Sequence, residues 1–381
     1  MAERLTRQLA FLTEADRLKL VNRSNVLMDG SRQENSAEHS WHLALFALTM
    51  ADHAPGVDIG KVLSMCLLHD LVEIDAGDHP IHEDFDAAEV ARNEQRAADR
   101  LFGILPDDQG AHLRAIWEEF EGAASPEAAY AKRVDFIQPV FQVLLSTGAP
   151  DWHFDIARDN LKTGRTAPMA DTWPALHGLA TRLLDGPADI PGELRFLAEA
   201  DRLKTVTRAT PILSAARREN SAEHSWHLML FALILAEQAA PGVDITRVMM
   251  MLLLHDLVEI DAGDVPVHGQ VDHAAIAVLE QAAADRLFGL LPEEKRYVFR
   301  SIWEEFEAAK TSDAVFAKSL DRVQPVMANL VDGGGSWIEY SVTRDQLETR
   351  VGIKVKRGAP AVWEALRPRI DAWFASHAAT G

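Results

Sequence analysis

Apolar residues recur at helical spacing along most of this chain. In the segment SWHLALFALTMADHA, residues 40–54, the apolar positions three to four residues apart are Leu43, Phe46, Ala47 and Met50. This spacing is typical of one buried helix face. Asn35 or Ser36 can cap the helix, and Glu38 in the first turn suits the helix dipole. We therefore predict a capped helix over this segment.

The same period predicts four more helices in the first half of the chain. The second helix covers residues 58–77, where Gly77 is expected to terminate it. The third and fourth helices cover residues 84–103 and 108–121. The fifth covers residues 125–145, where Pro139 is expected to disturb the helix. Strand signals are absent, so we predict an all-α fold.

Long strings of the sequence occur twice. The repeated strings are ENSAEHSWHL at 34–43 and 219–228, LLHDLVEIDAGD at 67–78 and 253–264, and WEEFE at 117–121 and 303–307. A period this long indicates a tandem duplication and not a solenoid. The segment DGPADIPG, residues 185–192, combines prolines and glycines and is expected to be the linker. We predict two domains, residues 1–187 and 188–381, each large enough to bury its own core.

The chain is strongly acidic, with 38 Lys and Arg against 58 Asp and Glu and a formal net charge of −20. This charge argues against a nucleic-acid polymer as partner, because a phosphate backbone requires a basic surface. Small anionic substrates are compatible with it, because a metal ion or an arginine can reverse the sign of charge inside one pocket.

The single cysteine, Cys66, lies in an apolar helical run and is expected to be a buried small hydrophobe. A disulfide within the chain is therefore excluded. The first 18 residues are amphipathic and charged, unlike a signal peptide, and no apolar run reaches the roughly 18 residues of a membrane span. We expect a soluble cytoplasmic protein without a membrane partner.

A set of histidines and aspartates recurs in both halves. Its members are His39, His69, Asp70 and Asp135, and then His224, His255, Asp256 and Asp321. Imidazoles and carboxylates together suit a divalent Zn, Mn, Co, Ni or Fe ion, and four protein ligands leave room for water. An open coordination position is typical of a catalytic site.

Taken singly, each of these residues has another interpretation, as a core histidine or a carboxylate on a helix surface. His69 and Asp70, however, end an apolar run in which a bare carboxylate is costly to bury. Asp135 and Asp321 are both retained although the residues before them have diverged, from AKRV to AKSL. We therefore predict one divalent metal ion in each half.

This pattern resembles the HD-domain phosphohydrolase superfamily, and the strings ENSAEHS, HDLVEIDAGD and WEEFE resemble its 5'-deoxynucleotidase-like branch. The resemblance covers both halves. It implies an all-α bundle, one divalent metal per domain, hydrolysis of a nucleotide phosphate ester and, commonly, a homodimer. It also implies that the recurring histidines and aspartates are the metal ligands.

The resemblance assigns roles to three further pairs of residues. Glu73 and Asp78, with Glu259 and Asp264 in the second copy, match the catalytic acidic pair of the family. Arg23 and Arg208 match an arginine that contacts phosphate, which a planar guanidinium suits. The alternatives are that Glu73 orients a ligating histidine, that Asp78 caps a turn, and that the arginines are solvated.

Other recurring residues have several interpretations. His82 and His268 could contact substrate, bind a second metal or lie in a loop, and we group them with the substrate contacts. His42 and His227 come one turn after the first ligand, where packing is favoured over ligation. Ser24 and Ala209 stand where the family often has an aromatic residue, which leaves base and sugar selectivity open.

The leading functional prediction is a metal-dependent phosphohydrolase for nucleoside or deoxynucleoside 5'-monophosphates or similar small phosphate esters. One alternative is an HD-type di-iron oxygenase, which needs extra histidine ligands such as His82. Another is a nucleotide-sensing module without turnover, although such a module need not retain Glu73 and Asp78.

The duplication also predicts the arrangement of the two halves. A symmetric pair buries the same surface on each partner. A short covalent linker raises the effective concentration of one half for the other. We therefore expect two helical bundles packed as a pseudo-twofold dimer within one chain, with no need for a second chain.

Overall fold

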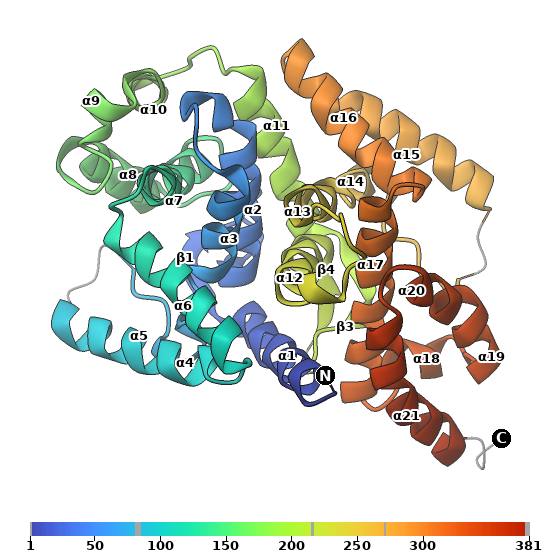
Figure 1. Ribbon diagram of the computed structural model, residues 1–381. Coiled ribbons are helices and arrows are strands. Elements are labelled where there is room, and N and C mark those ends of the chain that lie inside the picture. Colours follow the sequence, from blue (N-terminus) through green and yellow to red (C-terminus); the bar gives the residue numbers. More distant parts are fainter. Residues whose placement is uncertain (1, 81–84, 215–216, 270–271, 378–381) are drawn as a thin grey trace.

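The computed structural model of this chain describes residues 2–80, 85–214, 217–269 and 272–377. Helices account for most of these residues and form two bundles that lie side by side, coloured blue to green and yellow to red (Figure 1). The predicted all-α fold with two tandem bundles is confirmed. None of the helices in the described ranges has the length and apolar character needed to cross a membrane.

The elements of the N-terminal half are α1 (Ala2–Ala15), η1 (Asp16–Leu20), β1 (Asn22–Val26), β2 (Gln33–Asn35), α2 (Ser36–Thr49), η2 (Ala51–His53), α3 (Ile59–Leu68), α4 (Glu73–Ala76), α5 (Ala87–Phe102), α6 (Asp107–Gly122), α7 (Pro126–Leu144), α8 (Asp151–Thr163), α9 (Met169–Thr172) and α10 (Pro174–Asp185).

The elements of the C-terminal half are α11 (Gly192–Ala200), η3 (Asp201–Thr205), β3 (Thr207–Pro211), β4 (Arg218–Asn220), α12 (Ser221–Ile234), η4 (Ala236–Gln238), α13 (Ile245–Leu254), α14 (Glu259–Ala262), α15 (His273–Phe288), α16 (Glu293–Ala308), α17 (Ser312–Val331), α18 (Gly335–Glu339), α19 (Arg344–Leu347), η5 (Glu348–Gly352), α20 (Ile353–Gly358) and α21 (Pro360–His377).

Two small hairpins depart from the expectation that the chain has no strands. β1 pairs antiparallel with β2, and β3 pairs antiparallel with β4. Their sequences, such as NRSNV and QEN, are polar and lack the apolar alternation that indicates a strand. Tertiary contacts hold them instead: Gln142 of α7 donates from Nε2 to the carbonyl oxygen of Val26 at 2.8 Å.

The predicted helix start is confirmed by a reciprocal cap. The Asn35 side chain accepts from the backbone N–H of Glu38, and the Glu38 side chain accepts from the backbone N–H of Asn35. The predicted second helix is in fact two, because α3 ends at Leu68 and α4 begins at Glu73. Gly77 ends α4 with a φ of 81°, a conformation that favours glycine.

The expectation that Pro139 disturbs the fifth helix is wrong. Helix α7 runs through this residue to Leu144. A proline removes one helical hydrogen bond, but α7 is buried along one face against α2, α3 and α6. Packing of that face outweighs the loss of a single bond.

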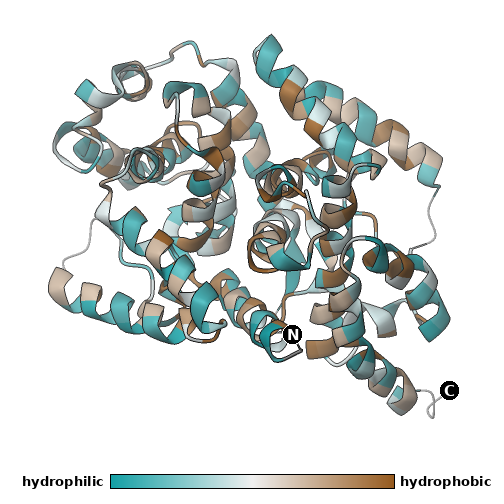
Figure 2. Ribbon diagram, viewed as in Figure 1, coloured by the Kyte–Doolittle hydropathy of each residue, from teal (hydrophilic) through white to brown (hydrophobic). Residues whose placement is uncertain are grey.

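The two halves meet along their most apolar helices. Helices α2 and α3 pack against α12 and α13, and these central helices carry much of the brown, hydrophobic colour in Figure 2. Trp41 donates from Nε1 to the carbonyl oxygen of Leu253 at 3.2 Å, and Trp226 donates to that of Leu67 at 3.4 Å. This reciprocity confirms the predicted pseudo-twofold dimer within one chain.

The halves come very close at equivalent positions near the pseudo-twofold axis. Gly60 and Thr246 occupy the same place in the two repeats, and a Cβ added to Gly60 would lie 2.1 Å from Thr246 Oγ1. The interface therefore has room for the Thr246 side chain only because its equivalent in the first repeat is a glycine.

Each half also extends its first helix onto the other half. Helix α1 packs on α12 and α21, and helix α11 packs on α2 (Figure 1). The linker predicted at residues 185–192 lies where expected, between the end of α10 at Asp185 and the start of α11 at Gly192. The domain boundary between residues 187 and 188 stays a prediction.

Candidate metal centre and its pocket

Three elements bring the predicted N-terminal ligands together. His39 lies in α2, His69 and Asp70 follow the end of α3, and Asp135 lies in α7. His39 Nε2 is 3.4 Å from Asp135 Oδ1, and His69 Nε2 is 3.0 Å from Asp70 Oδ1. His69 Nε2 is also 3.8 Å from Asp135 Oδ1. All four side chains therefore converge on one buried point.

The C-terminal half repeats this geometry with α12, the turn after α13 and α17. His224 Nε2 lies 3.5 Å from Asp321 Oδ1, and His255 Nε2 lies 3.0 Å from Asp256 Oδ1. In this half, one ligand atom from each of His224, His255 and Asp321 lies within 4.8 Å of the other two. The same holds in the N-terminal half for His39, His69 and Asp70.

The orientation of the imidazoles fits a metal ion. His69 Nδ1 is 2.9 Å from the carbonyl oxygen of Cys66, and His255 Nδ1 is 2.9 Å from that of Leu252. Each Nδ1 therefore carries the proton, and Nε2 presents its lone pair to the carboxylates. The Nε2 atoms of His69, His224 and His255 are buried without a hydrogen-bond partner among the described residues. These donors suit a divalent ion of borderline or hard character.

The predicted acidic pair lies beside the ligands. Glu73 begins α4, and its Oε2 accepts from the Ser36 hydroxyl at 2.6 Å. Burial, and then the nearby Asp70 carboxylate, raise the pKa of Glu73 well above its usual range. Burial also raises the pKa of Asp78. In the other half, Ser221 donates to Glu259 Oε2 at 2.5 Å.

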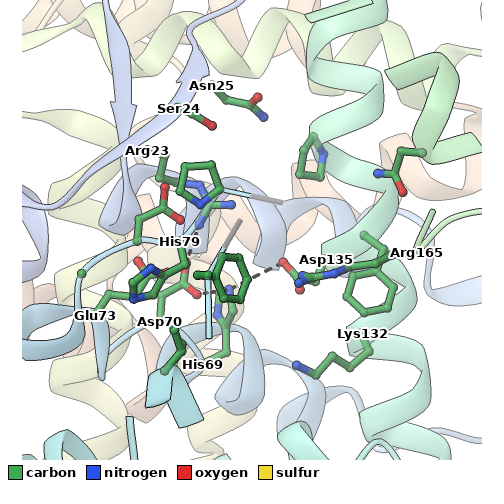
Figure 3. Close-up of a pocket in the computed structure, with 18 of the residues that line it drawn as sticks. Arg23, Ser24, Asn25, His69, Asp70, Glu73, His79, Lys132, Asp135 and Arg165 are labelled. Atoms are coloured by element: carbon green, nitrogen blue, oxygen red, sulfur yellow. Dashed lines mark hydrogen bonds and ion pairs between the residues drawn. The ribbon is translucent and has the colours of Figure 1, made fainter. Parts of the chain in front are cut away.

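The predicted arginines reach the same points from the hairpins. Arg23 in β1 donates from Nη1 to Asp70 Oδ2 at 2.9 Å (Figure 3). Arg208 in β3 donates to Asp256 Oδ2 at 2.8 Å. Its Nη1 also lies 3.7 Å from Glu259 and 3.6 Å from Asp264. Each hairpin thus serves to aim one guanidinium at the ligand cluster.

A pocket of about 410 Å³ opens above the N-terminal ligands. Arg23, Asp70 and Glu73 line one side of it, and Lys132 and Asp135 of α7 line the other (Figure 3). Among the described residues, the Lys and Arg side chains in its lining are Arg23, Lys132 and Arg165, and the aromatic ones include Phe85, Phe136 and Trp152. This pocket therefore suits a ligand that carries an anionic group next to an apolar group.

The C-terminal pocket is larger, at about 740 Å³, and differs in its walls. The cationic side chains in its lining are Arg208, Lys318, Arg322, Arg350 and Lys354. Burial and the neighbouring Arg322 and Lys318 lower the pKa of Lys354. Helices α18 to α20 supply these extra walls, whereas α8 covers the N-terminal pocket.

The remaining sequence predictions have mixed outcomes. His82 lies outside the described residues, while His268 lines the C-terminal pocket, where burial and then Arg350 and Arg322 lower its pKa to about 4. Neither His42 nor His227 points at the ligand cluster: His42 Nε2 is 3.0 Å from the carbonyl oxygen of Leu197. Cys66 is buried, and burial raises its thiol pKa.

Sequence reasoning missed two buried ion pairs behind the ligands. Lys19 Nζ donates to Glu219 Oε1 at 2.7 Å, and Lys204 Nζ donates to Glu34 Oε1 at 2.6 Å. The signal was present, because DRLK occurs at 16–19 and 201–204 and each glutamate precedes a repeated NSAEHS. Nothing local, however, indicated that either lysine is buried.

Comparison with known proteins agrees with this geometry. A family model described as HD domain matches residues 15–177 and again residues 200–363. The chain belongs to the HD domain family. Both HD domains carry a complete set of the recurring histidines and aspartates, and each match includes one hairpin with its arginine.

Several relatives of these HD domains are 5'-deoxynucleotidases. The chain is 30% identical to one from Danio rerio and 29% identical to one from Homo sapiens, each over 135 residues and 35% of the chain. It spans 66% and 65% of those proteins, just under two thirds of their length. A third, from Erwinia tasmaniensis, is 30% identical over 40% of this chain and 80% of its own.

A solved structure also shares sequence with this chain. It is a predicted metal-dependent phosphohydrolase from Magnetospirillum magnetotacticum, 41% identical over 48% of this chain and 93% of its own, with a TM-score of 0.45.

Proposed function

We propose that this chain is a metal-dependent phosphohydrolase whose two HD domains each hydrolyse a small phosphate monoester. One observation carries the proposal: in both halves, two imidazoles and two carboxylates converge beside a partly buried glutamate and an arginine. The 5'-deoxynucleotidase relatives support the reaction class.

The metal ligands in this proposal are His39, His69, Asp70 and Asp135, and their counterparts in the second half. A divalent ion held there lowers the pKa of a water molecule from about 15.7 toward about 7 and polarises the phosphoryl oxygen. Uncatalysed monoester hydrolysis is among the slowest reactions in biology, so such help is required.

The proton needed by the leaving group is assigned to Glu73 and Glu259. A carboxyl whose pKa is raised by burial keeps its proton to a higher pH than an exposed carboxyl does, and it can donate that proton. As water oxygen bonds to phosphorus, the ester P–O bond breaks, and the departing alkoxide takes this proton. Asp78 and Asp264, which line the same pockets, are assigned to orienting the water.

The phosphate is assigned to Arg23 and Arg208. Each guanidinium is partly buried beside several carboxylates, which raise its pKa against the effect of burial, so its charge is permanent. A phosphate oxygen that enters the pocket meets this fixed charge without rearrangement.

A nucleoside or deoxynucleoside 5'-monophosphate is the substrate class we propose for the N-terminal site. The phosphate would lie at Arg23 and Lys132, and the apolar wall that includes Phe85 and Trp152 can accept a base. Among the alternatives, a sensing module does not explain why both halves retain the glutamate and its serine partner.

A phosphate-release screen over nucleoside 5'-monophosphates, with and without a chelator, tests the proposal. We expect release that chelation abolishes and added divalent metal restores. The variant Asp70→Ala with Asp256→Ala should lose both metal and release. Asp155→Ala, which removes an exposed carboxylate paired with Arg158, serves as the control. Undiminished release from the double variant would overturn the proposed site.

A further inference from the structure

Two lysines lie fully buried at the junction of the halves. Lys19 in η1 belongs to the N-terminal half, yet its Nζ donates to Glu219 of the C-terminal half at 2.7 Å, as well as to Asp16. Lys204 in η3 does the reverse and donates to Glu34 at 2.6 Å, as well as to Asp201. Both lysine side chains have no exposed surface.

Burying an ammonium group is costly unless it is paired, so its retention in both repeats needs a reason. The paired glutamates supply one. Glu219 accepts from Lys19 through Oε1, and its Oε2 lies 3.0 Å from Nδ1 of the predicted ligand His224. In the other half, Glu34 Oε2 and His39 Nδ1 are 3.8 Å apart. Both of these atoms are buried and have no hydrogen-bond partner among the described residues.

We propose that Lys19 and Lys204 are positioning residues that complete the metal site of the opposite half. Each lysine ammonium group holds a glutamate carboxylate in place, and that carboxylate faces Nδ1 of the first histidine ligand and orients its ring. Nε2 of the same ring is then free for the metal. The inference rests on the proposed metal sites but not on which substrate they use.

The same geometry answers a competing interpretation of these residues. Asp16, Glu219 and His227 lie close enough to hold a cation, as do Glu34, His42 and Asp201. The lysine Nζ lies among them, 3.1 Å from His227 Nδ1 in one cluster and 3.3 Å from His42 Nδ1 in the other. The ammonium group therefore supplies the positive charge that these clusters require.

A crossed pattern of metal loss tests the proposal. In an Asp70→Ala background only the C-terminal site keeps its ligands, and in an Asp256→Ala background only the N-terminal site does. Lys19→Met should weaken metal binding about 10- to 100-fold in the first background and leave it unchanged in the second. Lys204→Met should do the opposite. Elemental analysis and titration with Co²⁺ measure both without an activity assay.

The companion variant Lys19→Met with Asp16→Asn removes one charge of each sign and covers the case in which the single variant does not fold. Thermal unfolding of the metal-free proteins separates folding from metal binding. Equal loss of metal at both sites, or loss at neither site, would show that the lysines only stabilise the interface. Either result would overturn the proposal.

A separate observation concerns what the two sites accept. The pockets have matching acidic residues: Asp70, Glu73, Asp78, Glu94, Glu121 and Asp135 in one, and Asp256, Glu259, Asp264, Glu280, Glu307 and Asp321 in the other. Arg23 and Lys132 of the first pocket match Arg208 and Lys318 of the second, but the other cations differ. Arg322 stands where the first half has Phe136, directly after the last predicted ligand, and Arg350 and Lys354 come from the diverged segment.

Six carboxylates line the same pocket, but among the described residues Arg350 and Lys354 form no ion pair with any of them. Arg322 Nε is buried without a hydrogen-bond partner among the described residues and is 3.8 Å from Asp321. Among the described residues, Arg350 donates only to the backbone oxygen of Val267. Like charges held near each other favour an anion between them.

We infer that the C-terminal site accepts a substrate with a second phosphoryl group, whereas the N-terminal site is built for a monophosphate. The additional cations, in a pocket almost twice as large, can hold a phosphate beyond the one at Arg208. This inference rests on the proposed function for the identity of the reacting group.

Calorimetry with inorganic pyrophosphate and inorganic phosphate tests it on metal-loaded Asp70→Ala and Asp256→Ala proteins. The Asp70→Ala protein should prefer pyrophosphate, and adding Arg350→Ala with Lys354→Ala should weaken that binding about tenfold. Arg357→Ala, an exposed cation on the same helix outside the pocket, is the control. The same pyrophosphate preference in both proteins would overturn the inference. If the Asp70→Ala protein alone prefers pyrophosphate but the chain releases no phosphate from nucleoside 5'-monophosphates, the inference stands and the proposed function is overturned.

Discussion

At the scale of single residues, burial decides the chemistry. Asp70 follows a helix whose last residues are all apolar, and its side chain is only 11% exposed. Nearby His69 and Arg23 hold the pKa of Asp70 well below its usual range, against the effect of burial. A carboxylate kept charged in such surroundings is suited to a cation.

The first prediction is that each half binds its own metal ion. Asp70→Ala and Asp256→Ala should each remove about one of two metal ions per chain, because each deletes one carboxylate from a four-ligand set. Elemental analysis of the purified proteins measures this. A chain with one ion that responds to only one substitution would show that the other half has lost its site.

The second prediction separates proton transfer from metal binding. Glu73→Ala combined with Glu259→Ala should lower turnover about 10²- to 10⁴-fold while both metal ions stay bound, because neither glutamate is a predicted ligand. Steady-state rates and metal content are measured on the same samples. Near wild-type turnover would assign these glutamates to structural support of the site.

At the scale of elements, the start of α2 carries more than a local cap. The Asn35 side chain accepts from the Glu38 backbone and also donates from Nδ2 to Glu223 of the other half at 3.0 Å. Asn220 donates to Glu38 at 2.6 Å in return. The two capping boxes are thereby joined across the interface.

Replacing one cap tests this joint role. Ser125→Ala, which removes the ordinary cap of α7, should cost about 0.5–2 kcal/mol of unfolding free energy. Asn35→Ala should cost about 1 kcal/mol more, because it also leaves the buried Glu223 carboxylate with one donor fewer. Denaturant unfolding of both variants gives the comparison. Equal losses would mean that the cross-interface bond contributes nothing.

At the scale of the whole molecule, the interface and not the linker holds the halves together. The central helices α2, α3, α12 and α13 are buried along their length, and the first helix of each half crosses to the other. An interface of this kind resembles a domain core.

Cutting the linker should therefore leave the halves associated. A protease site placed between residues 186 and 191 should give two fragments that elute together in size-exclusion chromatography. Gly60→Ala should weaken that association, since the added Cβ meets Thr246, whereas Gly122→Ala faces open space and should not. The exchanged pair Gly60→Thr with Thr246→Gly should restore it. Separation of the wild-type fragments after cleavage would contradict the prediction.

Much of this protein could be predicted from its sequence. Helical periodicity and the capping pattern located α2, α5 and α6 because those signals depend on neighbouring residues. Duplication exposed the candidate ligands, since His39, Asp70 and Asp135 recur while the residues around them vary. The resemblance of the repeated strings then pointed to the HD domain family, which the comparisons confirm.

Other features depended on tertiary structure. The polar hairpins, the uninterrupted α7 and the two different pocket walls all arise from packing between distant segments. Lys19 and Glu219 are 200 residues apart, and nothing local indicates that their charges are buried together. The sequence by itself determined the helices and the candidate ligands, because these follow from local period and recurrence. Only the tertiary structure decided that each buried lysine pairs with a glutamate of the other half, because that pairing exists only once the two halves have packed.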